Sequence, residues 1–154
     1  MKTKDFEKLV KKDKYQVFLF VSAAHFPYMF AVHPWFVLND HGKLSRWEVL
    51  HKKHPTENIH LHKDTNKPID GISVFTVYPK FKWNSKLLGV TEGDKNSKVA
   101  KIIKFIESSK ETYPHSQIYA LRGTNSNTYA QWVINNFPDL EFKLPWNAFG
   151  KNYK

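Results

Sequence analysis

Apolar and polar positions follow two different rhythms along the chain, and these rhythms predict both strands and helices. Apolar and β-branched stretches are typical of strands, and they occupy Tyr15–Ser22, His33–Leu38, Leu44–Leu50, His60–His62, Ile72–Tyr78 and Gln117–Leu121. Apolar positions three and four residues apart are typical of amphipathic helices, and they occur over 4–13, 97–110 and 126–136. The segment 80–94 shows neither rhythm and predicts irregular chain.

Turn and capping residues order these elements. Residues 39–42, Asn-Asp-His-Gly, predict a turn that joins two strands into a hairpin. Ser97 is a favoured helix N-cap, and Pro138 predicts the end of the last helix. We therefore expect an α+β fold in which a largely antiparallel sheet of about five strands is packed by two or three helices. The C-terminal aromatic residues are expected to fold back onto the core: Trp146, Phe149 and Tyr153.

Length and composition predict one globular domain spanning residues 1–154. A hydrophobic content of 41% with 16% aromatic residues excludes an intrinsically disordered chain. Since the chain has no cysteine, disulfides, thiolate metal sites and a cysteine nucleophile are excluded. This composition fits a reducing compartment, so we expect a cytoplasmic protein.

The apolar stretch Tyr15–Ala24 raises the question of targeting. It is interrupted by His25 and Pro27 and is too short to span a membrane. A signal peptide has a short basic start and a clean cleavage site, which this segment lacks. We expect core strands and no integral membrane segment, while a cleaved or anchoring N-terminal segment stays open as the alternative.

The net charge of +10 comes almost entirely from lysine, because only Arg46 and Arg122 are arginines. Readout of base edges more often uses the arginine fork, so nucleic acid is an unexpected partner. Binding to nucleic acid or to an anionic membrane surface is nevertheless one hypothesis for the function, ranked after the two given at the end of this section. It predicts lysines gathered on one face beside exposed aromatic rings.

The most concentrated chemical signal is the turn Asn125-Ser126-Asn127 at the start of the last helix. Free N–H groups at a helix start can hold an oxyanion, and the helix dipole favours negative charge there. Ser126 is therefore a candidate nucleophile, although it needs a base. The alternative is simple helix capping, for which Ser, Thr and Asn are the preferred residues.

His33 and Glu48 are the candidate base and its orienting carboxylate. If the hairpin loop is 39–42, Leu38 pairs with Lys43 and His33 lies opposite Glu48 on one face of the sheet. A carboxylate there orients the imidazole and stabilises its charged form. A one-residue slip would move Glu48 to the other face, and an ion pair between Arg46 and Glu48 is the competing interpretation.

Metal and cofactor binding are not expected. Five of the eight histidines lie between His41 and His62, but none shows a recognised ligand spacing. A solvated, partly basic surface explains them better.

Several short motifs resemble one family when they are taken together. They are His33-Pro34-Trp35-Phe36, Arg46-Trp47-Glu48-Val49, Tyr113-Pro114, Gly123–Thr128, Leu144-Pro145 and Gly150–Tyr153. In this order they resemble the bacterial domain-of-unknown-function 3750 family over about Ala31 to Tyr153. The chain departs from that family's pattern at Thr124, Tyr129 and Asn152, where the family prefers Pro, Phe and Asp.

The order of His33, Glu48 and the turn around Ser126 is also similar, more distantly, to circularly permuted papain-like enzymes of the NlpC and lecithin:retinol acyltransferase type. That resemblance implies a permuted papain-like fold, with Ser126 where those enzymes carry the catalytic cysteine. Serine lacks the low pKa of a thiol, so the site is either a serine variant or an inactive one that only binds.

The candidate site and these resemblances lead to two hypotheses about the function, which rank above nucleic-acid or membrane binding. In the first, a hydrolase or acyltransferase acts on an amide, ester or thioester, with Ser126 as nucleophile, His33 as base and Glu48 as orienting group. In the second, the same fold is an inactive module that binds a small molecule, peptide, glycan or lipid. The candidate binding residues are Asn125, Asn127, Trp35, Trp47 and Arg46.

Overall fold

The computed structural model describes residues 1–153. Its centre is a five-stranded antiparallel sheet in the order β4-β3-β2-β1-β7. These strands are β1 (Tyr15–Ala23), β2 (Val32–Asp40), β3 (Lys43–Val49), β4 (Leu61–Lys63) and β7 (Lys86–Gly93). A separate two-stranded ribbon is formed by β5 (Ser73–Phe75) and β6 (Tyr78–Lys82).

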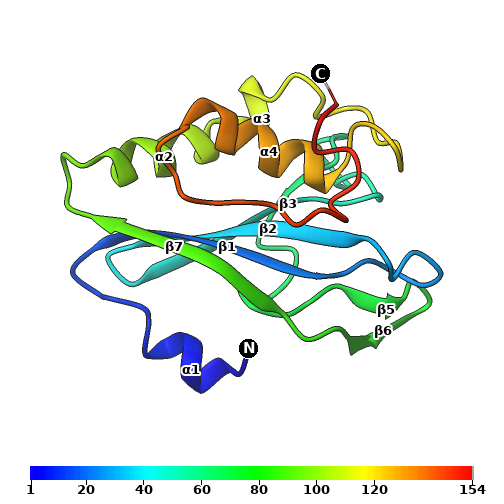
Figure 1. The fold of residues 1–154 in the computed structure, drawn as a ribbon, viewed down its shortest axis with the longest axis horizontal. Coiled ribbons are helices and arrows are strands. Elements are labelled where there is room, and N and C mark those ends of the chain that lie inside the picture. Colours follow the sequence, from blue (N-terminus) through cyan, green and yellow to red (C-terminus); the bar gives the residue numbers. More distant parts are fainter. Residues whose placement is uncertain (154) are drawn as a thin grey trace.

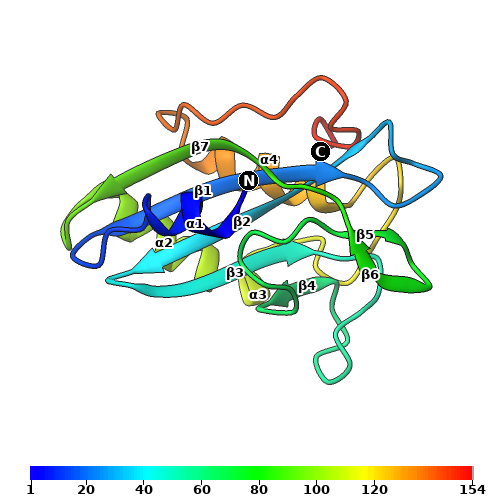
Figure 2. The same ribbon diagram turned by 90° about the horizontal axis from the view of Figure 1, so that it is seen from below.

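Helices cover the two faces of the sheet unequally. Figure 1 shows α2 (Lys98–Glu107), α3 (Ser109–Thr112) and α4 (Ser126–Asn136) on one face, and the short α1 (Thr3–Glu7) on the other. Figure 2 shows the order of the strands from below, with β5 and β6 at one end of the sheet. The mixed fold with an antiparallel sheet is as the sequence predicts.

The alternation of side chains along the strands divides the core in two. Phe36 and Leu38 of β2 belong to the larger core under α2 and α4. Trp35 and Val37, one residue out of step, belong to the smaller core beneath α1, together with Phe6 of that helix. Because successive strand side chains point to opposite faces, every functional residue on β2 or β3 is assigned to one of these two sides.

The elements with strong local signals were predicted correctly. The helix after Ser97 begins with the Ser97 side chain accepting a hydrogen bond from Ala100 N–H at 3.4 Å. The last helix spans Ser126–Asn136, as its pattern indicates. The first two strands and the hairpin partner Lys43–Val49 also agree with prediction within two residues.

Four local predictions were wrong. The first helix, predicted over 4–13, ends at Glu7. The buried Gln16 side chain holds the backbone that follows in a non-helical path, because it donates to Leu9 O and accepts from Lys11 N–H. The predicted strand 72–78 divides into the exposed ribbon β5–β6, and the supposedly irregular 80–94 contains the edge strand β7. The predicted strand 117–121 is a loop closed by backbone hydrogen bonds, with Ala120 N–H donating to Thr124 O at 2.8 Å.

Within residues 1–153, no helix is long and apolar enough to cross a membrane.

Candidate functional site

The structure brings His33, Glu48 and Arg46 together on the face of the sheet beneath α1. His33 lies on β2 in step with Trp35, and Arg46 and Glu48 lie on β3. The predicted hairpin register is wrong by two residues, because Leu38 pairs with Ser45 and not with Lys43. The actual turn is His41-Gly42, with φ of 50° and 89°, which is the compact turn that continues the twist of a hairpin. A shift of two residues preserves the face, so Glu48 still lies on the side of His33.

Both carboxylate oxygens of Glu48 accept hydrogen bonds. Its Oε2 atom lies 2.9 Å from His33 Nε2 and 2.7 Å from an Arg46 guanidinium nitrogen. Its Oε1 atom accepts from the side chain of Asn66 at 3.0 Å. Burial would raise the pKa of the Glu48 carboxyl, but the hydrogen bond from His33 and the charge of Arg46 outweigh burial and lower it to about 2. Because ionised Glu48 only accepts, His33 Nε2 carries the hydrogen, and Nδ1 is the ring nitrogen left to act as a base.

Arg46 ties this cluster to the loop that follows β4. Its guanidinium donates to Lys67 O at 2.9 Å and also to Asp70 O. The same group lies 4.1 Å from the ring centre of Trp35, in a cation–π contact. Burial lowers the pKa of Arg46, while the neighbouring Glu48 raises it. Both the predicted His33–Glu48 contact and the competing Arg46–Glu48 ion pair are therefore present, as parts of one buried network.

Ser126 lies on the other side of the sheet. The helix that it begins packs on Phe36 of β2, with the Phe36 and Tyr129 ring centres 6.2 Å apart. His33 points to the opposite face, where it contacts Glu48, whereas Asn127 beside Ser126 donates its side-chain amide to Val32 O at 3.1 Å. The serine beside His33 is Ser22, its direct partner across the β1–β2 ladder. Ser22 Oγ donates to Ala23 O at 3.1 Å and accepts from Ile72 N–H at 3.3 Å.

The side chains of the turn 125–128 hold the C-terminal segment against the start of α4, and we call this turn the clamp. Asn125 caps α4 by accepting from Asn127 N–H at 2.9 Å and Thr128 N–H at 3.3 Å, and Thr128 completes the capping box. The amide groups of Asn125 and Asn127 both donate to Phe149 O, at 3.2 and 2.9 Å. Thr128 Oγ1 donates to Gly150 O at 2.9 Å. These side chains fasten the C-terminal segment to the start of α4.

The predicted binding residues on the sheet are not open to a ligand in this arrangement. Arg46 and Trp35 are fully buried beneath α1, where the Trp35 indole donates to Pro68 O at 2.8 Å. Trp47 is buried on the opposite face, and its indole donates to Ser45 Oγ at 3.1 Å. The two tryptophans therefore do not line one groove.

An open pocket of about 360 Å³ lies beside the clamp and was not predicted from the sequence. Its lining is Arg122 with the C-terminal residues Trp146, Ala148, Phe149, Gly150, Lys151, Asn152 and Tyr153. Trp146 is 83% exposed, so the backbone of this segment folds back as expected while the indole does not enter the core. The available signal was the aromatic, acid-free composition of residues 143–153.

Two histidines of the stretch 41–62, predicted as solvated surface, are buried instead and contact backbone carbonyls. His60 Nδ1 contacts Leu50 O at 2.9 Å, and His62 Nε2 contacts Lys52 O at 2.7 Å. Over the part of the chain that the structure describes, no group of three or more histidine or acidic side chains could hold a metal ion.

Comparison with known proteins gives one match. The model of a family described as "Protein of unknown function (DUF3750)" matches residues 14–153. The comparison with curated proteins found no match, and neither did the comparison with solved structures.

Proposed function

The chain belongs to the DUF3750 family, whose description states no function, and from the geometry above we propose that it is a binding module for a small amphipathic anion. The observation that carries the proposal is the open pocket of about 360 Å³ between Arg122 and the C-terminal segment. The exposed rings of Trp146 and Tyr153 offer apolar surface, and the Arg122 guanidinium offers a charge. Such a combination suits a ligand with an apolar part and one acidic group.

The clamp supports this proposal because it fixes one wall of the pocket. Gly150 has a φ of 90°, and a Cβ atom there would lie 2.6 Å from Gly123 O. The segment therefore approaches the start of α4 as closely as its backbone allows. Held by Asn125, Asn127 and Thr128, the wall is organised before a ligand arrives, which lowers the ordering cost of binding.

Calorimetric titration with decanoate and with decanol tests the proposal, because the two probes share an alkyl chain and differ in charge. We expect decanoate to bind the protein more tightly than decanol. Arg122→Gln should weaken decanoate binding roughly tenfold, which is the worth of one charge-assisted hydrogen bond, and leave decanol binding unchanged. Lys101→Gln, on the exposed side of α2, is the matched control for loss of one positive charge. Equal binding of decanoate to all three proteins would contradict the assignment of the pocket.

A second candidate is hydrolysis or transfer of an acyl group, with Ser126 as nucleophile, His33 as base and Glu48 as orienting group, as the resemblance to permuted papain-like enzymes implies. The 2.9 Å contact between His33 and Glu48 supports it. It requires Ser126, at the start of α4, to reach His33, whose ring lies beside Trp35 on the face beneath α1. Covalent labelling with a fluorophosphonate probe tests it. Labelling that Ser126→Ala abolishes and Ser22→Ala retains would support this candidate, whereas unlabelled wild-type protein would contradict it.

A further inference from the structure

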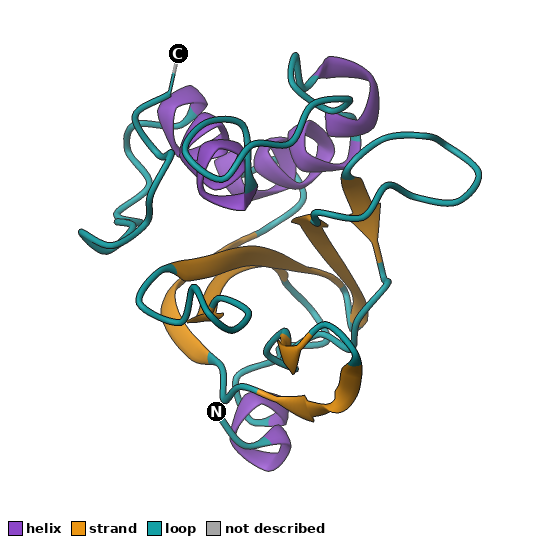
Figure 3. Cartoon of the chain, turned by 90° about the vertical axis from the view of Figure 1, so that its right-hand side faces the viewer, coloured by secondary structure: helices purple, strands orange, loops and turns teal. Residues whose placement is uncertain are grey.

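One end of the molecule exposes an unusual amount of apolar side chain. Three segments contribute to it: the loop 24–31 between β1 and β2, the β5–β6 ribbon, and the C-terminal residues 143–153. The loop and the ribbon lie on the right in Figure 1, and Figure 3 views the molecule from that side. The exposed fractions are 76% for Val77, 65% for Phe81, 62% for Tyr78 and 61% for Phe30. We call these three segments the apolar end. Contiguous exposed apolar side chains are typical of sites that bind another protein or a membrane.

The apolar end is one continuous surface. Phe26 N–H donates to Val74 O at 2.8 Å, and the rings of Phe26 and Phe75 lie 5.8 Å apart. On the other side of the loop, the rings of Phe30 and Phe149 lie 6.0 Å apart. These contacts join the loop to the ribbon and to the C-terminal segment.

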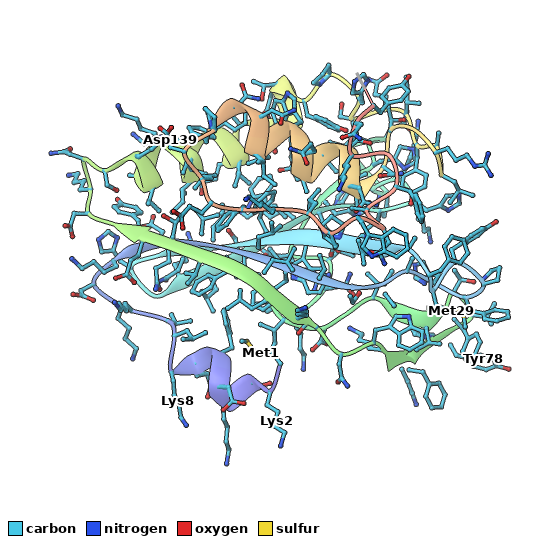
Figure 4. The ribbon with its side chains drawn as sticks, viewed as in Figure 1. Met1, Lys2, Lys8, Met29, Tyr78 and Asp139 are labelled. Carbon is cyan, nitrogen blue, oxygen red and sulfur yellow. The ribbon has the colours of Figure 1, made fainter. Side chains whose placement is uncertain are left out.

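Figure 4 shows the same grouping at the level of side chains, with the labelled Met29 and Tyr78 at one extremity of the molecule. The acidic Asp139 is labelled at the opposite extremity. The loop 24–31 and the ribbon, represented by Met29 and Tyr78, therefore lie together at one extremity of the molecule.

Charge distinguishes this end from the rest of the chain. All 14 acidic residues lie outside residues 24–31, 73–86 and 143–153. These ranges contain Lys80 and Lys82 of the ribbon, Lys86 at the start of β7, and Lys143 and Lys151 of the C-terminal segment. Only Lys82 has an acidic partner among residues 1–153, Asp70 at 2.9 Å. An occupant of the apolar end must therefore present apolar and negatively charged groups together.

From this combination we infer that the apolar end docks on the surface of a bilayer containing anionic lipids. Aromatic rings insert favourably at the boundary between headgroups and acyl chains, and lysines beside them are attracted by anionic headgroups. A nucleic-acid surface would use stacking rings and arginine forks. The most exposed large hydrophobic side chain of the ribbon is instead the aliphatic Val77, which cannot stack on a base. The pocket shares the C-terminal segment with the apolar end, but Val77, Tyr78 and Phe81 of the ribbon lie outside its lining and can be changed separately.

Co-sedimentation with vesicles of phosphatidylcholine, alone or mixed with phosphatidylglycerol, tests the inference. We expect the protein to sediment with the mixed vesicles and to bind the zwitterionic ones more weakly. Tyr78→Ser/Phe81→Ser should lower partitioning into both at least roughly tenfold, since two exposed rings that would insert into the bilayer are lost. Leu9→Ser/Val90→Ser is the matched control, because it removes two exposed apolar side chains elsewhere.

A charge variant separates the two contributions. Lys80→Gln/Lys86→Gln should lower binding to the mixed vesicles by about fivefold per lysine and leave binding to phosphatidylcholine unchanged. Circular dichroism of each variant verifies the fold, and Tyr78→Ser/Phe81→Ser should keep decanoate binding, because neither residue lines the pocket, so that docking and pocket are tested separately.

Three results would overturn the inference: wild-type protein that stays in the supernatant, equal loss in the control pair, or binding to a single-stranded oligonucleotide in place of vesicles.

Discussion

Replacement of Glu48 by glutamine tests the buried network directly. In the folded protein the pKa of Glu48 is lowered from its ordinary 4.5 to about 2. The group is almost wholly buried, so solvent screens this effect little. The difference corresponds to about 3 kcal/mol of stability. Because the folded pKa lies below the unfolded one, this stabilisation is complete above about pH 5 and is lost as the pH falls toward 2. About 2 kcal/mol of it should be gone at pH 3.

At pH 7 the variant Glu48→Gln leaves the Arg46 guanidinium buried without its counter-charge. We expect a loss of roughly 3–5 kcal/mol in the free energy of unfolding, measured by urea denaturation followed by circular dichroism. Near pH 3 the difference from wild type should shrink, because wild-type Glu48 is then protonated in the unfolded chain. Glu107→Gln, an exposed residue of α2, is the control and should follow the wild-type curve.

The double variant Arg46→Met/Glu48→Met supplies a further check, because it removes both charges and keeps the volume filled. It should be more stable than Glu48→Gln alone. Two results would refute this reasoning. One is a parallel loss of stability of Glu48→Gln and wild type between pH 7 and pH 3. The other is a Glu48→Gln variant whose free energy of unfolding at pH 7 falls by less than about 1 kcal/mol, because the network would then not contain an ionised pair.

Two further predictions concern the clamp and can be measured in the same way. Asn125→Ala should cost about 1–2 kcal/mol of stability, because α4 loses its cap and the C-terminal segment loses one of its donors; a cost near zero would mean that water replaces the cap without loss. Gly150→Ala should free the C-terminal segment from α4 and weaken decanoate binding, because the φ of 90° at Gly150 and its approach to Gly123 O exclude a Cβ atom. Limited proteolysis should then cut the variant faster than wild type within residues 143–153 and leave α2 uncut. An unchanged cleavage pattern would count against the tight packing of this segment.

The sequence by itself determined the elements whose signals are local. The hairpin turn at 39–42, the Ser97 cap and the apolar spacing of α2 and α4 each act within a few residues. They therefore predicted the β2–β3 hairpin and both long helices correctly. Even the register error at the hairpin left Glu48 on the face of His33, because the face depends only on whether the count is odd or even.

Only the tertiary structure decided what depends on partners distant in the chain. Strand β7 forms because its backbone pairs with β1, which its side-chain pattern does not show. Ser126 lies at the predicted helix start, but the face on which α4 packs, and hence its separation from His33, is set by the cores on either side of the sheet. The pocket beside Arg122 and the apolar end arise in the same way, from segments that are remote in sequence. Local sequence patterns determine the hydrophobic period and the ends of a helix or strand. Strand pairing and helix packing depend instead on which surfaces come together when the whole chain folds.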